Sequence, residues 1–194
     1  MQHRRHILIS AAALSCAPAL WAQPAFPHKP LKIVVPNAAG GAADITARTV
    51  GQKLSEALGQ PVVIDNKPSA GGIVAAEMVA KAEPDGHTLL LISNGNVVSS
   101  ALFKSLSYDP VNDFAMISTL GYFGLVIVAD PKLPAKNINE LIAMARAKPG
   151  EVVYASSGHG GAAFLAAEML KLKTGIRMLH VPYKGTIPAL TAML

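Results

Sequence analysis

Short apolar runs alternate with amphipathic stretches from residue 31 onward, and this alternation predicts buried strands connected by helices. Strands are predicted at 31–35, 62–64 and 89–92, and helices at 42–58 and from 72 to about 82. Gly59 follows the first helix directly, at the position where a glycine commonly ends a helix. The resulting β-α-β-α-β order predicts an α/β fold with a parallel sheet covered by helices on both faces.

In the second half of the chain, two consecutive predicted strands come first, and the alternation of strands and helices then resumes. Two further strands are predicted at 114–118 and 125–128. Beyond Pro131 and Pro134, a helix is predicted at 138–148, a strand at 152–155, a helix at 162–173, a strand at 178–181 and a helix around 188–190. We therefore predict two α/β domains, at 23–120 and 121–194, with the transition between about Phe114 and Pro134.

The first 22 residues have the pattern of a cleaved export signal. Arg4 and Arg5 form a basic start, residues 7–14 form a short apolar core, and Ala22 precedes the predicted cleavage point at Gln23. Sec and twin-arginine export both stay open for this segment. Cys16 is the single cysteine of the chain, so a disulfide within the chain is excluded. Cleavage would also remove this residue.

The charge balance disfavours nucleic-acid binding. Lys and Arg number 17 against 12 Asp and Glu, and two of the basic residues lie in the predicted signal, so the balance beyond residue 22 is 15 minus 12, or +3. These charges are spread singly, and aromatic residues make up only 5% of the chain. A nucleic-acid surface would concentrate basic side chains and add aromatic ones for stacking on bases.

Two strand-to-helix turns are candidates for ligand binding. The turn at 37–43 consists of small residues, and the turn at 156–162 is rich in glycine. Each places backbone N–H groups and a helix N-terminus at the carboxyl end of a parallel strand, where anions are favoured and where α/β sheets bind ligands. For one turn alone, small residues that merely permit a tight bend are an equal alternative. Two such turns, one in each predicted domain, favour an anionic ligand held between them.

Enzyme motifs are incomplete. Gly158–Ala163 fits a loose G-x-G-x-x-A fingerprint, but no acidic residue follows Glu168 to hold a ribose. Ser156 and Ser157 lie between a strand and a helix but lack the G-x-S-x-G pattern, and no histidine spacing indicates a metal site. We therefore predict no catalytic residue, no metal and no cofactor, and we interpret Asp44 as a residue that complements the N-terminus of its helix.

Seven short blocks, in order along the chain, resemble the substrate-binding receptors of tripartite tricarboxylate transporters, the Bug receptor family. They are 26–30, 35–44, 58–63, 84–89, 108–110, 154–158 and 180–185. The resemblance implies a periplasmic-binding-protein-like fold (Venus flytrap, type II-like) that binds one small carboxylate between its domains in the periplasm. It also implies partners, namely the large and small integral membrane subunits of the transporter.

By matching position, the resemblance implies a ligand-binding set drawn from both domains. The set is Ala38, Ala39, Gly40, Gly41, Ala42, Ala43, Ser93, Asn94, Asn96, Ser156, Ser157, His159, Gly160, Gly161, Tyr183, Lys184 and Gly185. We expect binding to depend on backbone donors, so that Lys184→Ala weakens it modestly. Gly41→Pro is expected to abolish it, because proline removes an N–H and fixes φ where glycine can use a conformation that other residues avoid.

Members of this family continue past the helix around 188–190, so we expect a shortened form with the second domain and part of the first incomplete. A fragment, a frameshifted gene and a natural short form are the alternatives, and such a form could be non-functional. The leading hypothesis is capture of an organic acid for a membrane transporter. A sensory module that presents a carboxylate to a membrane signalling partner is the first alternative. An α/β enzyme is the second, and the sequence offers it no acid–base pair.

Overall fold

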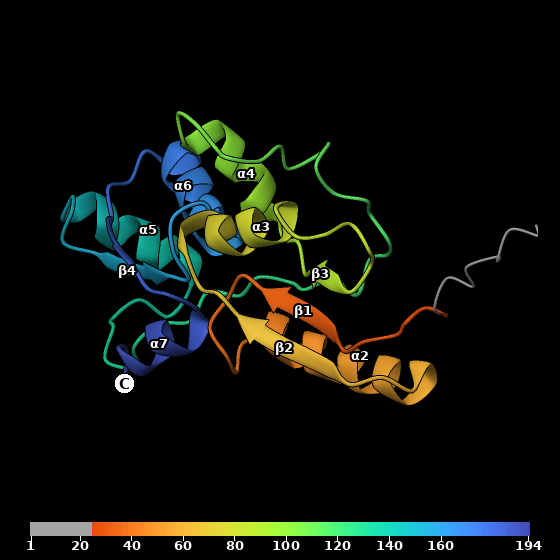
Figure 1. The fold of residues 1–194 in the computed structure, drawn as a ribbon. Coiled ribbons are helices and arrows are strands. Elements are labelled where there is room, and N and C mark those ends of the chain that lie inside the picture. Colours follow the sequence, from red (N-terminus) through yellow and green to blue (C-terminus); the bar gives the residue numbers. More distant parts are fainter. Residues whose placement is uncertain (1–24) are drawn as a thin grey trace, which may run out of the picture.

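Three strands of the first half form one parallel sheet in the computed structural model, which describes residues 25–194 (Figure 1). They are β1 (Leu31–Val35), β2 (Val62–Asn66) and β3 (Thr88–Leu90), hydrogen-bonded in the order β2-β1-β3. The register places Leu31 opposite Val62 and Lys32 opposite Thr88. The predicted α/β class is therefore confirmed, whereas the export signal predicted at 1–22 lies outside the described residues.

Helices lie on both sides of this sheet. α2 (Ala42–Leu58) connects β1 to β2, and the 3-10 turn η1 (Ala70–Gly72) followed by α3 (Ile73–Ala80) connects β2 to β3. The two crossovers run in opposite directions across β1, so right-handed connections place α2 and α3 on opposite faces. α4 (Asn94–Leu102) follows β3 and completes what we call the first lobe, which consists of β1–β3 with α2, α3 and α4.

The middle strand β1 supplies most of the core of the first lobe. Ile33 and Val35 pack with Ala47 of α2 in one buried cluster, and Val34 points to the opposite face and is fully buried. Successive side chains of a strand point to opposite faces, so a central strand with helices on both sides needs a nearly continuous apolar run. This requirement explains why the apolar run at 31–35 predicted the strand correctly.

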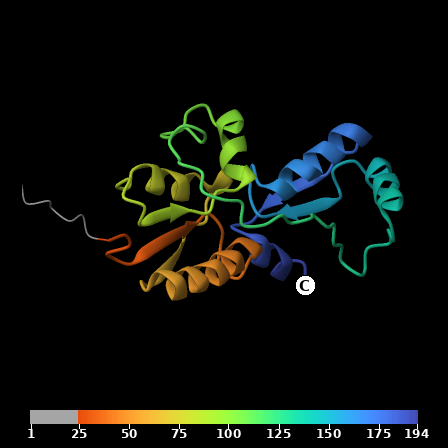
Figure 2. The same ribbon diagram turned by 90° about the vertical axis from the view of Figure 1, so that its right-hand side faces the viewer.

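The second half forms a smaller parallel sheet. α5 (Ile138–Ala147), β4 (Val153–Ser156), α6 (Ala162–Thr174) and β5 (Leu179–Pro182) make up the second lobe, in which β4 pairs with β5. Its core consists of Ala145, Ile176 and Met178. Figure 2 shows the two lobes side by side, with the short α7 (Thr186–Thr191) returning from β5 toward the N-terminal end of α2.

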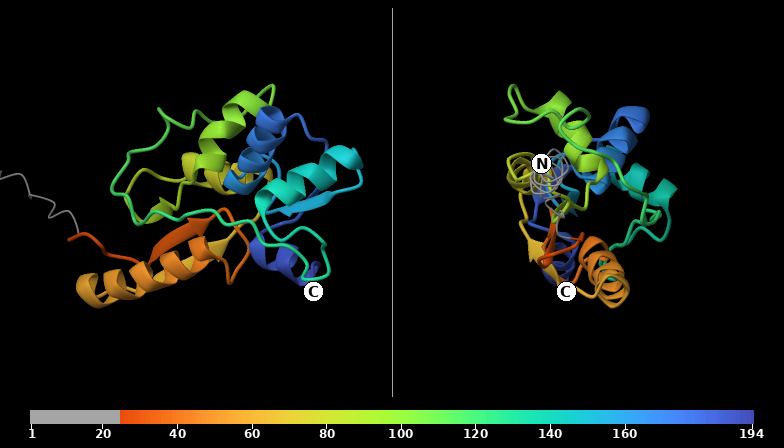
Figure 3. Two further views of the ribbon diagram at one scale, coloured as in Figure 1. Left: turned by 180° about the vertical axis from the view of Figure 1, so that it is seen from behind. Right: turned by 45° about the vertical axis from the view of Figure 1, so that its right-hand side comes forward.

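The strands predicted at 114–118 and 125–128 are absent from the structure. Residues 115–130 run over the surface between α4 and α5 without strand pairing (Figure 3). Ile117 is 80% exposed, Tyr122 92% and Val126 84%. A strand exists only when its backbone pairs with a neighbour, and no described segment pairs with these apolar residues. The prediction from the apolar pattern was therefore wrong here.

Candidate functional site

Four strand-to-helix turns converge on one small cavity between the lobes. It has a volume of about 30 Å³ and is lined by Pro36, Asn37, Ser69, Gly71, Gly72, Ser93, Gly95, Ser157, His159 and Gly161. These residues follow β1, β2, β3 and β4, so the cavity lies at the carboxyl ends of strands from both sheets. Ligands of open α/β sheets bind at this end of the strands.

The lobes touch directly beside this cavity, backbone to backbone. The Gly71 N–H donates a hydrogen bond of 3.0 Å to the His159 carbonyl oxygen. A side chain added at Gly160 would lie 3.8 Å from the Gly71 Cα, and one at Gly95 would lie 3.5 Å from the Gly160 carbonyl oxygen. A cavity of this size has room for about one water molecule. Any larger ligand therefore requires the lobes to separate.

The turn between β2 and α3 contributes three cavity residues that the sequence analysis did not single out. Gly71 and Gly72 adopt consecutive left-handed conformations, with φ of 62° and 72°. A Cβ at Gly71 would lie 1.9 Å from Ser99 Oγ, and one at Gly72 would lie 2.7 Å from Asn96 Nδ2. The sequence did contain a pattern that could have predicted them, because Ser69–Gly72 stands between a strand and a helix as the two predicted turns do.

Two side chains of α4 hold this turn in place. Asn96 Nδ2 donates to the Gly72 carbonyl oxygen at 3.0 Å, and its Oδ1 accepts the Ser93 N–H at 3.0 Å. Ser99 Oγ lies 2.7 Å from the Gly95 carbonyl oxygen and 3.2 Å from that of Gly71. Asn96 is fully buried, so the structure places this predicted ligand residue behind the cavity wall. Ser93 and Gly95 line the cavity in its place, and the predicted Asn94 does not.

The turn after β1 reaches the cavity through Pro36 and Asn37, whereas the predicted residues 38–43 lie beside it. Asp44, in the first turn of α2, accepts the Gly40 N–H and the Arg48 Nε–H, both at 2.9 Å. The hydrogen bond from Arg48, followed by the one from the Gly40 backbone, overcomes burial and lowers the pKa of this carboxyl. Asp44 lies in the first turn of α2, where it was expected to complement the helix N-terminus. It also holds the preceding turn by accepting the Gly40 N–H, which was expected to serve the ligand.

The predicted turns at 38–41 and 183–185 are brought together, but against each other rather than around the cavity. A Cβ at Gly185 would lie 3.0 Å from the Ala38 Cβ, and one at Gly40 would lie 3.8 Å from Ile187 Cγ1 of α7. Tyr183 and Lys184 are not among the lining residues. Gly41 has φ of −81°, a value open to other residues including proline. The conformational reason expected for a block by Gly41→Pro is therefore wrong, and the loss of the N–H stays as the other expected reason.

In the turn after β4, Ser157, His159 and Gly161 line the cavity, and all three belong to the expected ligand-binding set. Ser156 and Gly160 are both buried beside them. Ser156 Oγ lies 2.7 Å from His180 Nε2 and accepts the Gly158 N–H at 3.2 Å. With only 3% of its surface exposed, Ser156 offers no access to a substrate.

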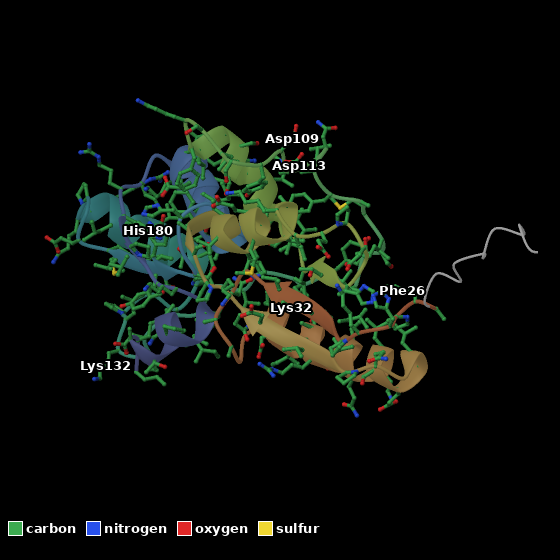
Figure 4. The ribbon with its side chains drawn as sticks, in the orientation of Figure 1. Phe26, Lys32, Asp109, Asp113, Lys132 and His180 are labelled. Atoms are coloured by element: carbon green, nitrogen blue, oxygen red, sulfur yellow. The ribbon has the colours of Figure 1, made fainter. Side chains whose placement is uncertain are left out.

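His180 lies in the second lobe (Figure 4), where its ring contacts the rings of Tyr154, His159 and Phe164. Its ring stacks on Tyr154 at 4.8 Å, and the Tyr154 hydroxyl donates to Glu168 at 2.5 Å. Glu168 is paired with Lys171 at 2.7 Å. Burial, together with the nearby His159, lowers the pKa of His180 and favours its neutral form.

The cavity wall is polar but carries little charge. Its lining contains no lysine, arginine or carboxylate, and His159 is the one lining residue with an ionisable side chain. Within residues 25–194, no group of three His, Cys, Asp or Glu side chains is placed to hold a metal ion. No helix of the same region combines the length and apolar character needed to cross a membrane.

A larger depression of about 510 Å³ lies along α2 and β2, lined by Arg48, Gly51, Gln52, Ser55, Glu56, Pro61, Val62 and Ile64. It opens widely to solvent and draws on one lobe only. No helix N-terminus points into it, and it exposes apolar side chains of an edge strand. The small cavity is the better candidate site because both lobes and four strand ends build it.

Comparisons with known proteins agree on one family. The family model described as "Tripartite tricarboxylate transporter family receptor" matches residues 46–194. Protein BugT of Bordetella pertussis is 38% identical over 171 residues, which cover 87% of this chain and 52% of BugT. The chain thus spans about half the length of the curated relatives it matches.

Two solved structures have the same fold. The periplasmic binding protein BugD is 35% identical with a TM-score of 0.76, covering 87% of this chain and 56% of BugD. MatC from Rhodopseudomonas palustris, with bound malate, is 33% identical with a TM-score of 0.79, covering 87% of this chain and 57% of MatC. The fold of the chain is therefore that of periplasmic binding proteins, as the resemblance implied.

Proposed function

Because the chain belongs to the tripartite tricarboxylate transporter receptor family, we propose that it binds a small carboxylate between its two lobes and delivers it to the transporter. The partners would be the large and small integral membrane subunits of that transporter. One observation carries the proposal: turns after β1, β2, β3 and β4 converge on a single cavity to which both lobes contribute. The relative MatC, whose structure holds malate, supports a carboxylate as the ligand.

The chemistry of the cavity suits a carboxylate. Helix N-termini present backbone N–H groups and a partial positive charge of about half a unit each, so they stabilise an anion without a charged side chain. The N-cap residues of α3, α4 and α6, which are Gly72, Ser93 and Gly161, all line the cavity. The Gly71 N–H, which donates to the His159 carbonyl in the structure, becomes a free donor once the lobes separate.

The proposal extends to organisation and location. The two lobes would correspond to domains at 23–120 and 121–194, and residues 1–22 would direct export to the periplasm. Mass spectrometry of periplasmic material tests the export step, with Gln23 or a neighbour expected at the N-terminus. Retention of Met1 in that material would contradict export.

Titration calorimetry with a panel of mono-, di- and tricarboxylates tests the binding step. We expect at least one carboxylate to bind with a single site, and amides of the same acids not to bind. Lys184→Ala is the matched control outside the cavity, and we expect it to change the affinity less than about threefold, because Lys184 is exposed. Absence of binding to every acid of the panel would contradict the proposal.

A further inference from the structure

We propose that His159 is the charge-reading residue of the cavity: its imidazolium pairs with the second carboxylate of a dicarboxylate ligand, so that binding tightens as the pH falls. This inference rests on the proposed function and names its ligand class. The other nine lining residues are proline, asparagine, serine and glycine, so only His159 changes charge. Backbone N–H groups hold one carboxylate, and His159 supplies the partner that a second one needs.

The position of His159 is fixed from two sides, while its ring nitrogens stay available. Its carbonyl oxygen accepts the Gly71 N–H from the first lobe. Its ring stands edge to face against Phe164 at 5.4 Å and against His180 at 4.8 Å. Among residues 25–194, no side-chain hydrogen bond engages the His159 imidazole, and the residue is exposed. An exposed ring that contacts only other rings keeps both nitrogens free to donate to a ligand.

Among the groups around His159, only His159 itself is expected to change its charge near neutral pH. From β5 it faces His180, whose neutral form is favoured by burial and which contacts Ser156 Oγ at 2.7 Å. From α6 it faces Phe164, and the Glu168–Lys171 pair lies behind Tyr154. From the first lobe the facing residues, including Gly71, Ser93 and Gly95, carry no ionisable side chain. Protonation of His159 therefore changes the charge of the cavity by one unit.

The sign of the pH dependence follows from this arrangement. A bound dicarboxylate stabilises the imidazolium form, so the complex holds its proton to a higher pH than the free protein does. The added affinity is present at low pH and is lost as the pH rises through the titration of the complex. With one linked proton, the Kd for malate is expected to rise between pH 6 and pH 8, by at most about tenfold per pH unit.

Calorimetry of the full chain with malate at pH 6, 7 and 8 tests the inference. His159→Gln keeps a side chain of similar size without the charge, and we expect a Kd close to the wild-type pH 8 value at every pH. His28→Gln is the matched control, because His28 is also exposed and contacts a histidine ring, that of His87, at 4.5 Å. It should keep the wild-type pH dependence. 2-Hydroxybutyrate, which replaces one carboxylate of malate by a methyl group, should bind weakly and independently of pH.

A second measurement does not depend on how well the variants fold. In the NMR spectrum of the wild-type protein, saturating malate should move the titration midpoint of the His159 ring to higher pH. A malate affinity independent of pH, or a pH dependence kept by His159→Gln, would overturn the role of His159 and leave the proposed function standing. Absence of malate, 2-hydroxybutyrate and all other carboxylate binding would instead remove the proposed function, and this inference with it.

Discussion

Gly71 is the position at the site where adding a single methyl group should lower stability the most. A Cβ there would lie 1.9 Å from Ser99 Oγ and 3.3 Å from Ser99 Cβ, and φ is 62°. The left-handed conformation costs a residue with a side chain about 1–2 kcal/mol, and forcing extra atoms into a packed site adds about 1–3 kcal/mol. Gly71→Ala should therefore lower the free energy of unfolding by about 2–5 kcal/mol.

Gly59→Ala separates the two contributions. Gly59 has φ of 68°, nearly the value at Gly71, but nothing lies within 4 Å of its added Cβ. It should show only the backbone contribution of about 1–2 kcal/mol. In a Ser99→Ala background, Gly71→Ala should lose most of its excess, because the clashing oxygen is gone. Urea unfolding followed by circular dichroism measures all four variants. Equal losses for Gly71→Ala and Gly59→Ala would refute the packing argument.

Three further predictions concern other parts of the molecule. Asp44→Asn should lower the free energy of unfolding by about 1–3 kcal/mol at pH 7, because it weakens the partly buried hydrogen bonds from Gly40 and Arg48. Folding lowers the pKa of Asp44, so the stability difference between wild type and Asp44→Asn should be fully present above the pKa of this carboxyl in the unfolded chain. The difference should disappear as the pH falls through the pKa of Asp44 in the folded protein. Denaturant titrations at several pH values measure it. Gly41→Pro should leave carboxylate affinity within about threefold in calorimetry, because φ at Gly41 is −81°. The 194-residue chain alone should self-associate through its exposed apolar segment, and Val126→Lys should raise the monomer fraction in light scattering.

The sequence predicted the elements whose packing is one-sided or fully buried. β1 and α2 have the predicted bounds, and Gly59 ends α2 in a left-handed conformation. A nearly continuous apolar run, a helical period and a glycine all indicate the same boundaries. α4 was missed. Its first residues include Asn94, Gly95 and Asn96, which are poor helix formers, and the structure holds them through hydrogen bonds to the distant turn at 71–72.

The site could be predicted only in outline. The carboxyl ends of parallel strands indicated which turns converge, and Ser157, His159, Gly161 and Ser93 do line the cavity. The sequence could not reveal that Asn96 points inward, or that residues 38–41 pack against Gly185. Those facts depend on how the two lobes and α7 meet, and contacts between distant segments leave no periodic pattern in a sequence.

Under the proposed function, the contact between the lobes favours a carboxylate over a neutral ligand as the molecule that opens the cavity. Near the cavity this contact consists of glycine backbone and one hydrogen bond, from the Gly71 N–H to the His159 carbonyl. Breaking a neutral hydrogen bond of this kind costs about 0.5–1.5 kcal/mol net. A carboxylate that accepts the same N–H forms a charge-assisted bond roughly twice as strong, so the exchange is favourable. A neutral carbonyl ligand would form a hydrogen bond no stronger than the one it replaces, so the exchange would bring it no gain.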